Sequence, residues 1–266
     1  MDRWKPNIVR AHNFGGKDRE ELALSPALRK ARDELLEIVR VLVGQHLAAM
    51  LDGITRVDAL RLAPSRPLGL KHIGFKDVGA GEPMLRRLTA AIREAGASPW
   101  MEVVSTSRKD ELRSIALARD LGVDWLMGGI HAEEGLRILE ESAIRYPPFA
   151  GKPRRHPTLL GGTAAEVEAL CRAFAAMGCA GVDILAYRAL EAEPLDLVAA
   201  CRRGLPNGGT VVVAGSINSA ERVAAVRAAG AFTIGTAAID PSYAPGAGPL
   251  AAQLRAVLED CRVATL

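Results

Sequence analysis

This chain of 266 residues contains few aromatic side chains and little excess of one sign of charge over the other. Phe, Trp and Tyr make up 4% of the sequence, and 34 Lys and Arg residues nearly balance 31 Asp and Glu residues, which leaves a formal net charge of +3. So balanced a charge argues against a nucleic-acid partner. The densest basic run, residues 152–156, is typical of a solvated loop.

Paired cysteines and long apolar runs are also absent. The four cysteines form no CxxC pair, which is typical of reduced thiols in a cytoplasmic protein. No stretch reaches the roughly 18 apolar residues that a membrane span requires, and the N-terminal residues do not resemble a signal peptide. We therefore expect a cytoplasmic protein that does not cross a membrane, and the sequence leaves open whether it forms a homo-oligomer.

From Leu70 onward, short apolar runs alternate with stretches of helical period, and apolar residues make up 49% of the chain. Strands that alternate with helices of about 10–15 residues form βαβ units and a parallel sheet. A (β/α)8 TIM barrel typically takes about 250 residues. We therefore predict an α/β fold, a single eight-stranded parallel TIM barrel over residues 1–266, with an irregular segment at about 52–70 between the first long helix and strand two. An open doubly wound sheet is the alternative.

Seven apolar runs are predicted as strands, and one candidate strand, residues 7–11, lies upstream of a long helix that begins at Ser25. Two later helices begin with the pattern of a capping box, at 163–166 and 218–221, and Gly230 has the position of a glycine that ends a helix. The seven strands are 72–75, 100–104, 124–127, 157–160, 182–185, 210–214 and 231–234.

Glycine followed by a hydroxyl residue ends each of the last two predicted strands, as Gly215-Ser216 and as Gly235-Thr236. Glycine lets backbone N–H groups approach a phosphate, and a helix N-terminus attracts its charge. Barrels often bind phosphate after strands seven and eight. These four residues therefore predict a phosphate site, although tight turns alone also use glycine.

Four ionisable residues are candidates for catalysis. Lys76 and Asp77 end strand two, where a lysine can stabilise an enolate or form a Schiff base and an aspartate can act as a general base. Glu102 and Asp183 lie inside apolar strands, where a carboxylate is costly unless it is paired or functional. If Glu102 points into the barrel, Lys76 on the neighbouring strand is its expected partner. A structural role is the alternative for each residue.

His131 and Arg188 follow strands four and six, where they could bind a substrate carboxylate or phosphate or donate a proton. No spacing of His, Cys, Asp and Glu resembles a zinc site. No cofactor is therefore evident, and a divalent metal is not excluded.

The runs 212–219 and 229–237 resemble the ribulose-phosphate-binding barrel group of phosphosugar lyases, isomerases and decarboxylases. The resemblance implies that phosphate rests on backbone amides at the two glycine–hydroxyl turns. The position of Lys76 is similar to that of a lysine in hexulose-phosphate synthases and ketogulonate-phosphate decarboxylases. Both flanking aspartates of their Asp-x-Lys-x-x-Asp pattern are missing here, which puts their metal-bound enediolate chemistry in doubt.

Together these residues predict a lyase, isomerase or epimerase that acts on a phosphosugar or phospho-keto acid through an enolate-type intermediate. The order of strands and helices is also similar to that of the glycerol-uptake antiterminator proteins. The alternative function is therefore a non-catalytic regulator that binds a phosphorylated small molecule. Neither the substrate nor the direction of reaction follows from the sequence, because one fold serves many functions.

Overall fold

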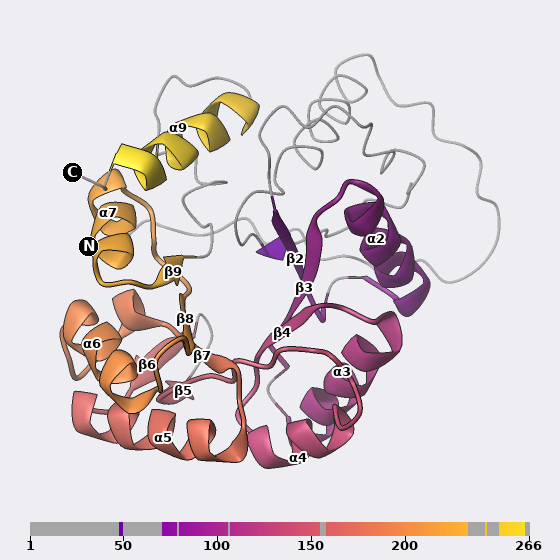
Figure 1. Cartoon of the computed structure of the whole chain (residues 1–266), viewed down its shortest axis with the longest axis horizontal. Coiled ribbons are helices and arrows are strands. Elements are labelled where there is room, and N and C mark those ends of the chain that lie inside the picture. The colour runs from indigo at the N-terminus through magenta and orange to yellow at the C-terminus, as the bar shows by residue number, and fades with distance from the viewer. Residues whose placement is uncertain are drawn as a thin grey trace, which may run out of the picture.

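The computed structural model describes residues 48–49, 71–78, 80–105, 107–154, 158–233, 243 and 250–263. Strands lie towards the middle of the molecule, and helices surround them on the outside (Figure 1). The strands are β1 (Ala48–Ala49), β2 (His72–Lys76), β3 (Ser98–Val103), β4 (Trp125–Gly128), β5 (Lys152–Arg154), β6 (Leu159–Gly161), β7 (Gly181–Ile184), β8 (Thr210–Val213) and β9 (Phe232–Thr233). The helices are α2 (Glu82–Glu94), α3 (Arg108–Leu121), α4 (Ala132–Ile138), α5 (Ala164–Met177), the 3₁₀-helix η2 (Ala186–Arg188), α6 (Pro194–Gly204), α7 (Ala220–Ala228) and α9 (Leu250–Val263).

Two parallel sheets, with the orders β1-β2-β3-β4 and β7-β8-β9, supply most of the strand layer. The extended segment 145–150 lies between them and forms parallel bridges to β4 and β7. The Leu126 N–H donates to the Arg145 carbonyl at 2.9 Å, and the Asp183 N–H donates to the Pro148 carbonyl at 2.8 Å. The two sheets and this segment give the parallel strand arrangement of the predicted α/β barrel.

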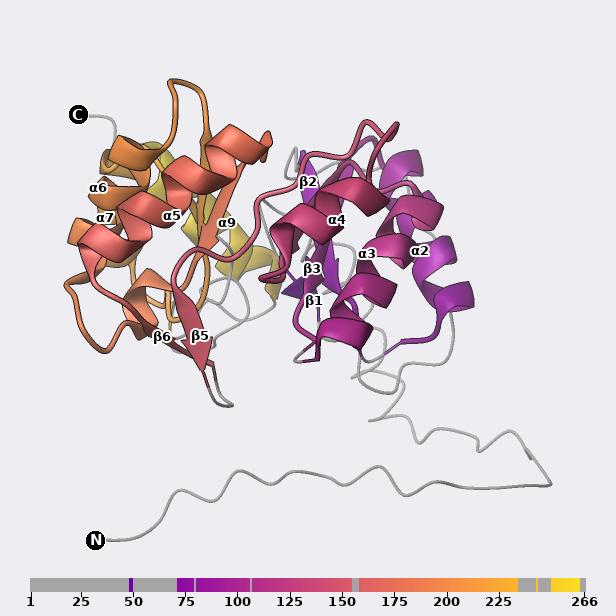
Figure 2. The ribbon, with the colours of Figure 1, turned by 90° about the horizontal axis from the view of Figure 1, so that it is seen from below.

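The prediction of a barrel strand at residues 157–160 is wrong. The described part of that run belongs to β6, which pairs antiparallel with β5, and the hairpin stands out below α5 and α6 in the view of Figure 2. Segment 145–150 takes the expected place between β4 and β7. Its two prolines, Pro147 and Pro148, carry no N–H, so they interrupt the regular ladder of hydrogen bonds. Because of them, the segment does not show the residue pattern of a strand in the sequence.

The strand beside β2 is β1, in which Ala48 lies opposite Gly74 in parallel register. The sequence predicts no strand at that position. The predicted strand 7–11, the helix from Ser25 and the irregular segment 52–70 lie outside the described residues.

The other six predicted strands are confirmed with small differences at their ends. The capping box of α5 is also confirmed, since the Thr163 hydroxyl accepts from the Glu166 N–H while the Glu166 carboxylate accepts from the Thr163 N–H. Helix α7 starts one residue later than predicted, because Ser219 rather than Asn218 is its N-cap. Gly230 follows α7 with a φ of 70°, the left-handed conformation expected after a helix.

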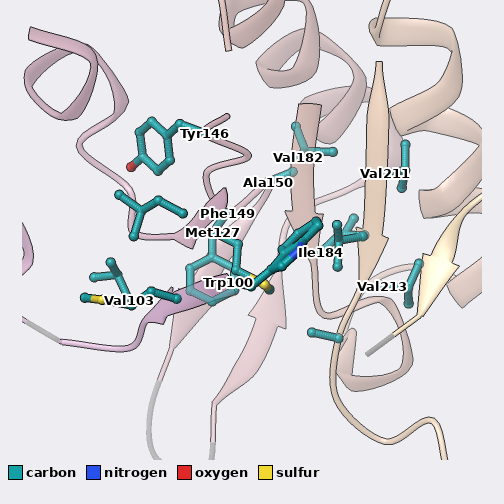
Figure 3. Packing of buried hydrophobic residues seen from close by; sticks show 14 of the residues in the cluster. Trp100, Val103, Met127, Tyr146, Phe149, Ala150, Val182, Ile184, Val211 and Val213 are labelled. Carbon is teal, nitrogen blue, oxygen red and sulfur yellow. The ribbon is translucent and has the colours of Figure 1, made fainter. Parts of the chain in front are cut away.

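One cluster of buried apolar side chains includes residues of both sheets and of the helices packed on them (Figure 3). Val182 and Ile184 on β7, like Val211 and Val213 on β8, are fully buried. Because side chains alternate along a strand, these valines and isoleucine leave Asp183 on the opposite face of β7. That residues 1–266 form one domain stays a prediction.

Candidate active site

The carboxyl ends of β2 and β3 bring a lysine and a glutamate together, as predicted. Lys76 and Glu102 are partners in the parallel register, and Lys76 Nζ lies 3.6 Å from Glu102 Oε2. The glutamate side chain is only 10% exposed. Burial raises the pKa of Glu102, and the charge of Lys76 opposes that rise.

Asp183 on β7 is completely buried, and neither of its carboxylate oxygens has a hydrogen-bond partner among the described residues. Burial raises the pKa of Asp183 well above its ordinary value, the Glu102 carboxylate raises it further, and Lys76 lowers it. The Ile184 N–H also lowers this pKa, although it does not meet hydrogen-bond geometry. A buried carboxyl without a partner is rare in proteins and calls for an explanation.

Lys76, Glu102 and Asp183 are linked electrostatically, since the charges of Lys76 and Glu102 both shift the pKa of Asp183. Along the sheet, β3 and β7 are separated by β4 and segment 145–150, which at about 4.8 Å per strand amounts to roughly 14 Å. Glu102 and Lys76 nevertheless act on the pKa of Asp183. Lys76, Glu102 and Asp183 therefore form one cluster, which we call the interior cluster.

The turn after β8 has an unusual backbone. Gly215 and Ser216 both have positive φ angles, 72° and 58°, and Ser216 lacks the freedom of glycine, so its conformation is strained. A Cβ atom on Gly215 would lie 2.6 Å from Arg188 Nε, and that nitrogen donates to the Ser216 hydroxyl at 3.2 Å. The structure thus brings together three predicted phosphate-site residues. Gly235 and Thr236 lie outside the described residues.

A second arginine supports this turn, and the sequence gives no sign of it. Arg222 donates to the Ser216 carbonyl at 2.5 Å and to Asn218 Oδ1 at 2.9 Å. Its guanidinium lies 4.8 Å from the centre of the Tyr187 ring. Arg188 and Arg222 form no ion pair with a carboxylate among the described residues, so positive charge gathers at the end of β8.

Asp77 is the candidate whose carboxylate holds a loop, and its charge also raises the pKa of Glu102. Its two oxygens accept from the Val104 N–H at 2.9 Å and from the Ser105 hydroxyl at 2.5 Å, which ties the loop after β3 to the end of β2. With both oxygens engaged, Asp77 positions this loop, and its predicted role as a general base stays a prediction.

His131 lies at the start of α4 and contacts a residue that sequence reasoning missed. Glu111 on α3 is 2% exposed and lies 2.8 Å from His131 Nδ1 through Oε2. One signal could have revealed it. Glu111 falls on the same helical stripe as the buried residues Ile115 and Ala118, where a charged side chain needs a partner.

The fold resembles several solved barrels. Orotidine 5′-phosphate decarboxylase from Pyrococcus horikoshii OT3 is 13% identical, with a TM-score of 0.55 over 79% of this chain and 96% of that chain. A putative deoxyribose-phosphate aldolase from Coccidioides immitis is 12% identical, with a TM-score of 0.53 over 82% and 96%. Thiamine phosphate pyrophosphorylase from Pyrococcus furiosus is 14% identical, with a TM-score of 0.51 over 84% and 98%. The chain is a (β/α)8 barrel.

This likeness shows the barrel fold that the resemblance in the sequence implies. No family model matches the sequence, and no curated protein matches it. At these identities the barrel fold alone is shared, so the chemistry of this barrel has to be argued from its own residues.

The described part of the barrel has neither a cluster of metal ligands nor a helix that could span a membrane. It contains no group of three or more His, Cys, Asp or Glu side chains that could hold a metal ion. None of its helices is both long enough and apolar enough to cross a membrane.

Proposed function

We propose that this barrel is an enzyme that acts on a phosphosugar or phospho-keto acid, as a lyase, isomerase or epimerase, through an enolate-type intermediate. The observation that carries the proposal is the interior cluster of Lys76, Glu102 and Asp183. A lysine that is 27% exposed and paired with one buried carboxyl group, and that interacts electrostatically with a second, provides both a positive charge and groups that exchange protons. Shifted pKa values such as those of Glu102 and Asp183 are characteristic of active sites.

In this proposal Lys76 stabilises the negative charge that develops on the substrate's carbonyl oxygen when an enolate forms. Glu102 fixes the ammonium group in place. Asp183, whose raised pKa favours its protonated form, gives a proton to the enolate carbon in one direction and removes it in the other. Because Lys76 is held in an ion pair with Glu102, we favour the electrostatic role over a Schiff base.

The phosphate of the substrate would bind at the β8 turn. Ser216 offers a hydroxyl, and Arg188 offers a planar guanidinium suited to phosphate. Gly215 keeps the approach to the backbone free of a side chain. The predicted residues Gly235 and Thr236 would complete the site. The proposed reaction needs no cofactor, and a divalent metal stays compatible with it. A cytoplasmic location and a homo-oligomer remain expectations.

The experiment is hydrogen exchange into phosphorylated ketoses. We would incubate the protein with dihydroxyacetone phosphate or ribulose phosphate in D2O and follow loss of the proton beside the carbonyl by NMR. Replacing Lys76 by Met should slow the exchange by about 10²–10³-fold, the usual effect of removing one preorganised charge. The control is Lys71→Met, since Lys71 precedes β2 and is exposed.

Two outcomes would decide against the proposal. Exchange that is as fast in Lys76→Met as in the parent would remove Lys76 from the mechanism. Binding of the ketoses without any exchange would favour the non-catalytic regulator instead. Borohydride treatment with substrate distinguishes the two lysine roles, because only a Schiff base leaves a reduced adduct on Lys76.

A further inference from the structure

A buried carboxylate that the interior cluster does not use lies between α3 and the loop after β4. Glu111 Oε1 accepts from the backbone N–H of Ile130 at 2.8 Å and from that of His131 at 2.7 Å. Its other oxygen, Oε2, lies 2.8 Å from His131 Nδ1. One carboxylate therefore holds both the backbone and the imidazole of His131.

These contacts determine which ring nitrogen of neutral His131 carries the proton. An ionised carboxylate only accepts hydrogen bonds, so Nδ1 must be the donor. The neutral ring then has its lone pair on Nε2, for which no partner is present among the described residues. The imidazole is 27% exposed, which leaves it accessible to a ligand.

The loop that carries His131 is packed rigidly. Gly129 has a φ of 72°, and a Cβ atom there would lie 2.6 Å from Glu111 Oε1 and 3.1 Å from the Tyr146 hydroxyl. At Gly135 on α4, a Cβ atom would lie 2.8 Å from the Tyr146 ring. The segment is thus packed against the Tyr146 side chain at Gly129 and Gly135 and against Glu111 at Gly129, so the imidazole has a fixed place.

That place is the edge of the barrel where function is expected. Met127 is the register partner of Glu102, and His131 follows it by four positions, beyond the carboxyl end of β4. Active sites of (β/α)8 barrels are built from the loops at this edge. His131 therefore lies on the same side of the barrel as the loops that follow β2 and β3.

We propose that Glu111 is a positioning residue that presents His131 Nε2 as a second proton acceptor, for a substrate hydroxyl next to the carbonyl. The proposal rests on the proposed function, because an enolate-forming reaction on a sugar moves hydroxyl protons as well as carbon-bound ones. The hydroxyl proton passes to Nε2, and the neighbouring oxygen receives it when the carbonyl group has moved. Glu111 stabilises the imidazolium that exists in between, as a carboxylate does in a His-containing triad.

The first measurement needs no substrate. NMR of the ring nitrogens, at a pH where the imidazole is neutral, should show His131 protonated at Nδ1, and Glu111→Gln should abolish this preference. Glu134→Gln is the matched control, since Glu134 also interacts electrostatically with His131 but pairs with Arg108. Protonation at Nε2 in the parent protein would overturn the proposal, whatever the state of the interior cluster.

The second measurement separates this proposal from the proposed function. With dihydroxyacetone phosphate as the probe, His131→Gln should slow conversion to the aldose about 10²–10⁴-fold, the usual contribution of a proton-transfer group, while proton exchange at carbon falls far less. Glu111→Gln should act in the same direction and Glu111→Asp should recover part of the rate. Equal loss of both rates, or no loss, would overturn the role of His131. Failure of the proposed function would instead appear as no exchange at carbon in the parent.

Discussion

Asp183 is the residue whose environment most needs a functional explanation. A buried polar group without a hydrogen bond costs roughly 1–3 kcal/mol in proteins. Both carboxyl oxygens of Asp183 are buried and lack a hydrogen-bond partner among the described residues. A buried carboxylate with a structural role is expected to have hydrogen-bond partners, as Glu111 has in three N–H groups. Retaining an unpartnered carboxyl inside the barrel is understandable if its proton is used in the reaction.

Because burial raises the pKa of Asp183, stability should depend on pH in a defined direction. Between the ordinary aspartate pKa of about 4 and the raised pKa, the folded state holds more protons than the unfolded chain. The free energy of unfolding therefore falls as pH rises through this window, by at most about 1.4 kcal/mol per pH unit. Asp183→Asn should remove that slope in urea denaturation, and the exposed Asp196→Asn should leave it unchanged.

Gly215 should be needed for anion binding because of both its conformation and its contact with Arg188. Gly215→Ala puts a methyl group against the Arg188 guanidinium and should weaken sulfate binding about tenfold or more, which corresponds to roughly 1.4 kcal/mol. Gly208→Ala is the matched control, since Gly208 has a φ of 90° and no atom within 4 Å of an added Cβ. Equal sulfate affinity in the parent and in Gly215→Ala would argue against an anion site at this turn.

At this scale the sequence predicts some contacts and not others. The Lys76–Glu102 pair follows from strand register and the cost of burying a lone carboxylate. The roles of Asp77 and Glu111 as holders of loops do not follow, because their partners are backbone N–H groups. Those groups come close only when the loops after β3 and β4 have folded, and no residue type marks them in the sequence.

At the scale of the elements, propensity and capping signals identify most strands and helices, and the exception is instructive. Segment 145–150 supplies a barrel position with Pro147 and Pro148 in it, whereas the more strand-like run 157–160 joins a hairpin. Proline holds a chain extended but cannot donate to a ladder. Only the folded structure, in which segment 145–150 lies between β4 and β7, therefore identifies this segment as part of the barrel.

The capping box of α5 allows a direct test of these local signals. Thr163→Ala removes the hydroxyl that accepts from the Glu166 N–H and should lower the free energy of unfolding by about 1 kcal/mol. The exposed Lys109→Ala on α3, which removes no N-cap, should change it by less than about 0.5 kcal/mol. Urea denaturation of both variants measures the difference, and equal stabilities would mean that the box contributes nothing.

At the scale of the whole molecule, the candidate site draws on both parallel sheets. Lys76 and Glu102 belong to the first sheet, whereas Asp183 and the turn after β8 belong to the second. Arg188 connects the two parts, because its charge lowers the pKa of Glu102 while its guanidinium donates to Ser216. An anion bound at the β8 turn should therefore shift the pKa of Glu102 in the interior cluster.

The connection through Arg188 predicts the direction in which the pKa of Glu102 shifts when sulfate binds. Sulfate bound beside Arg188 offsets the positive charge that lowers the pKa of Glu102, so the pKa rises and the protein takes up protons as sulfate binds. Sulfate suits this test because it does not itself titrate near neutral pH. Calorimetric titrations in buffers of different ionisation enthalpy should show proton uptake in the parent protein and little in Glu102→Gln, with sulfate affinity nearly unchanged. Equal uptake in both proteins would mean that the proton enters elsewhere and that the two halves of the site are not coupled through Arg188 and Glu102.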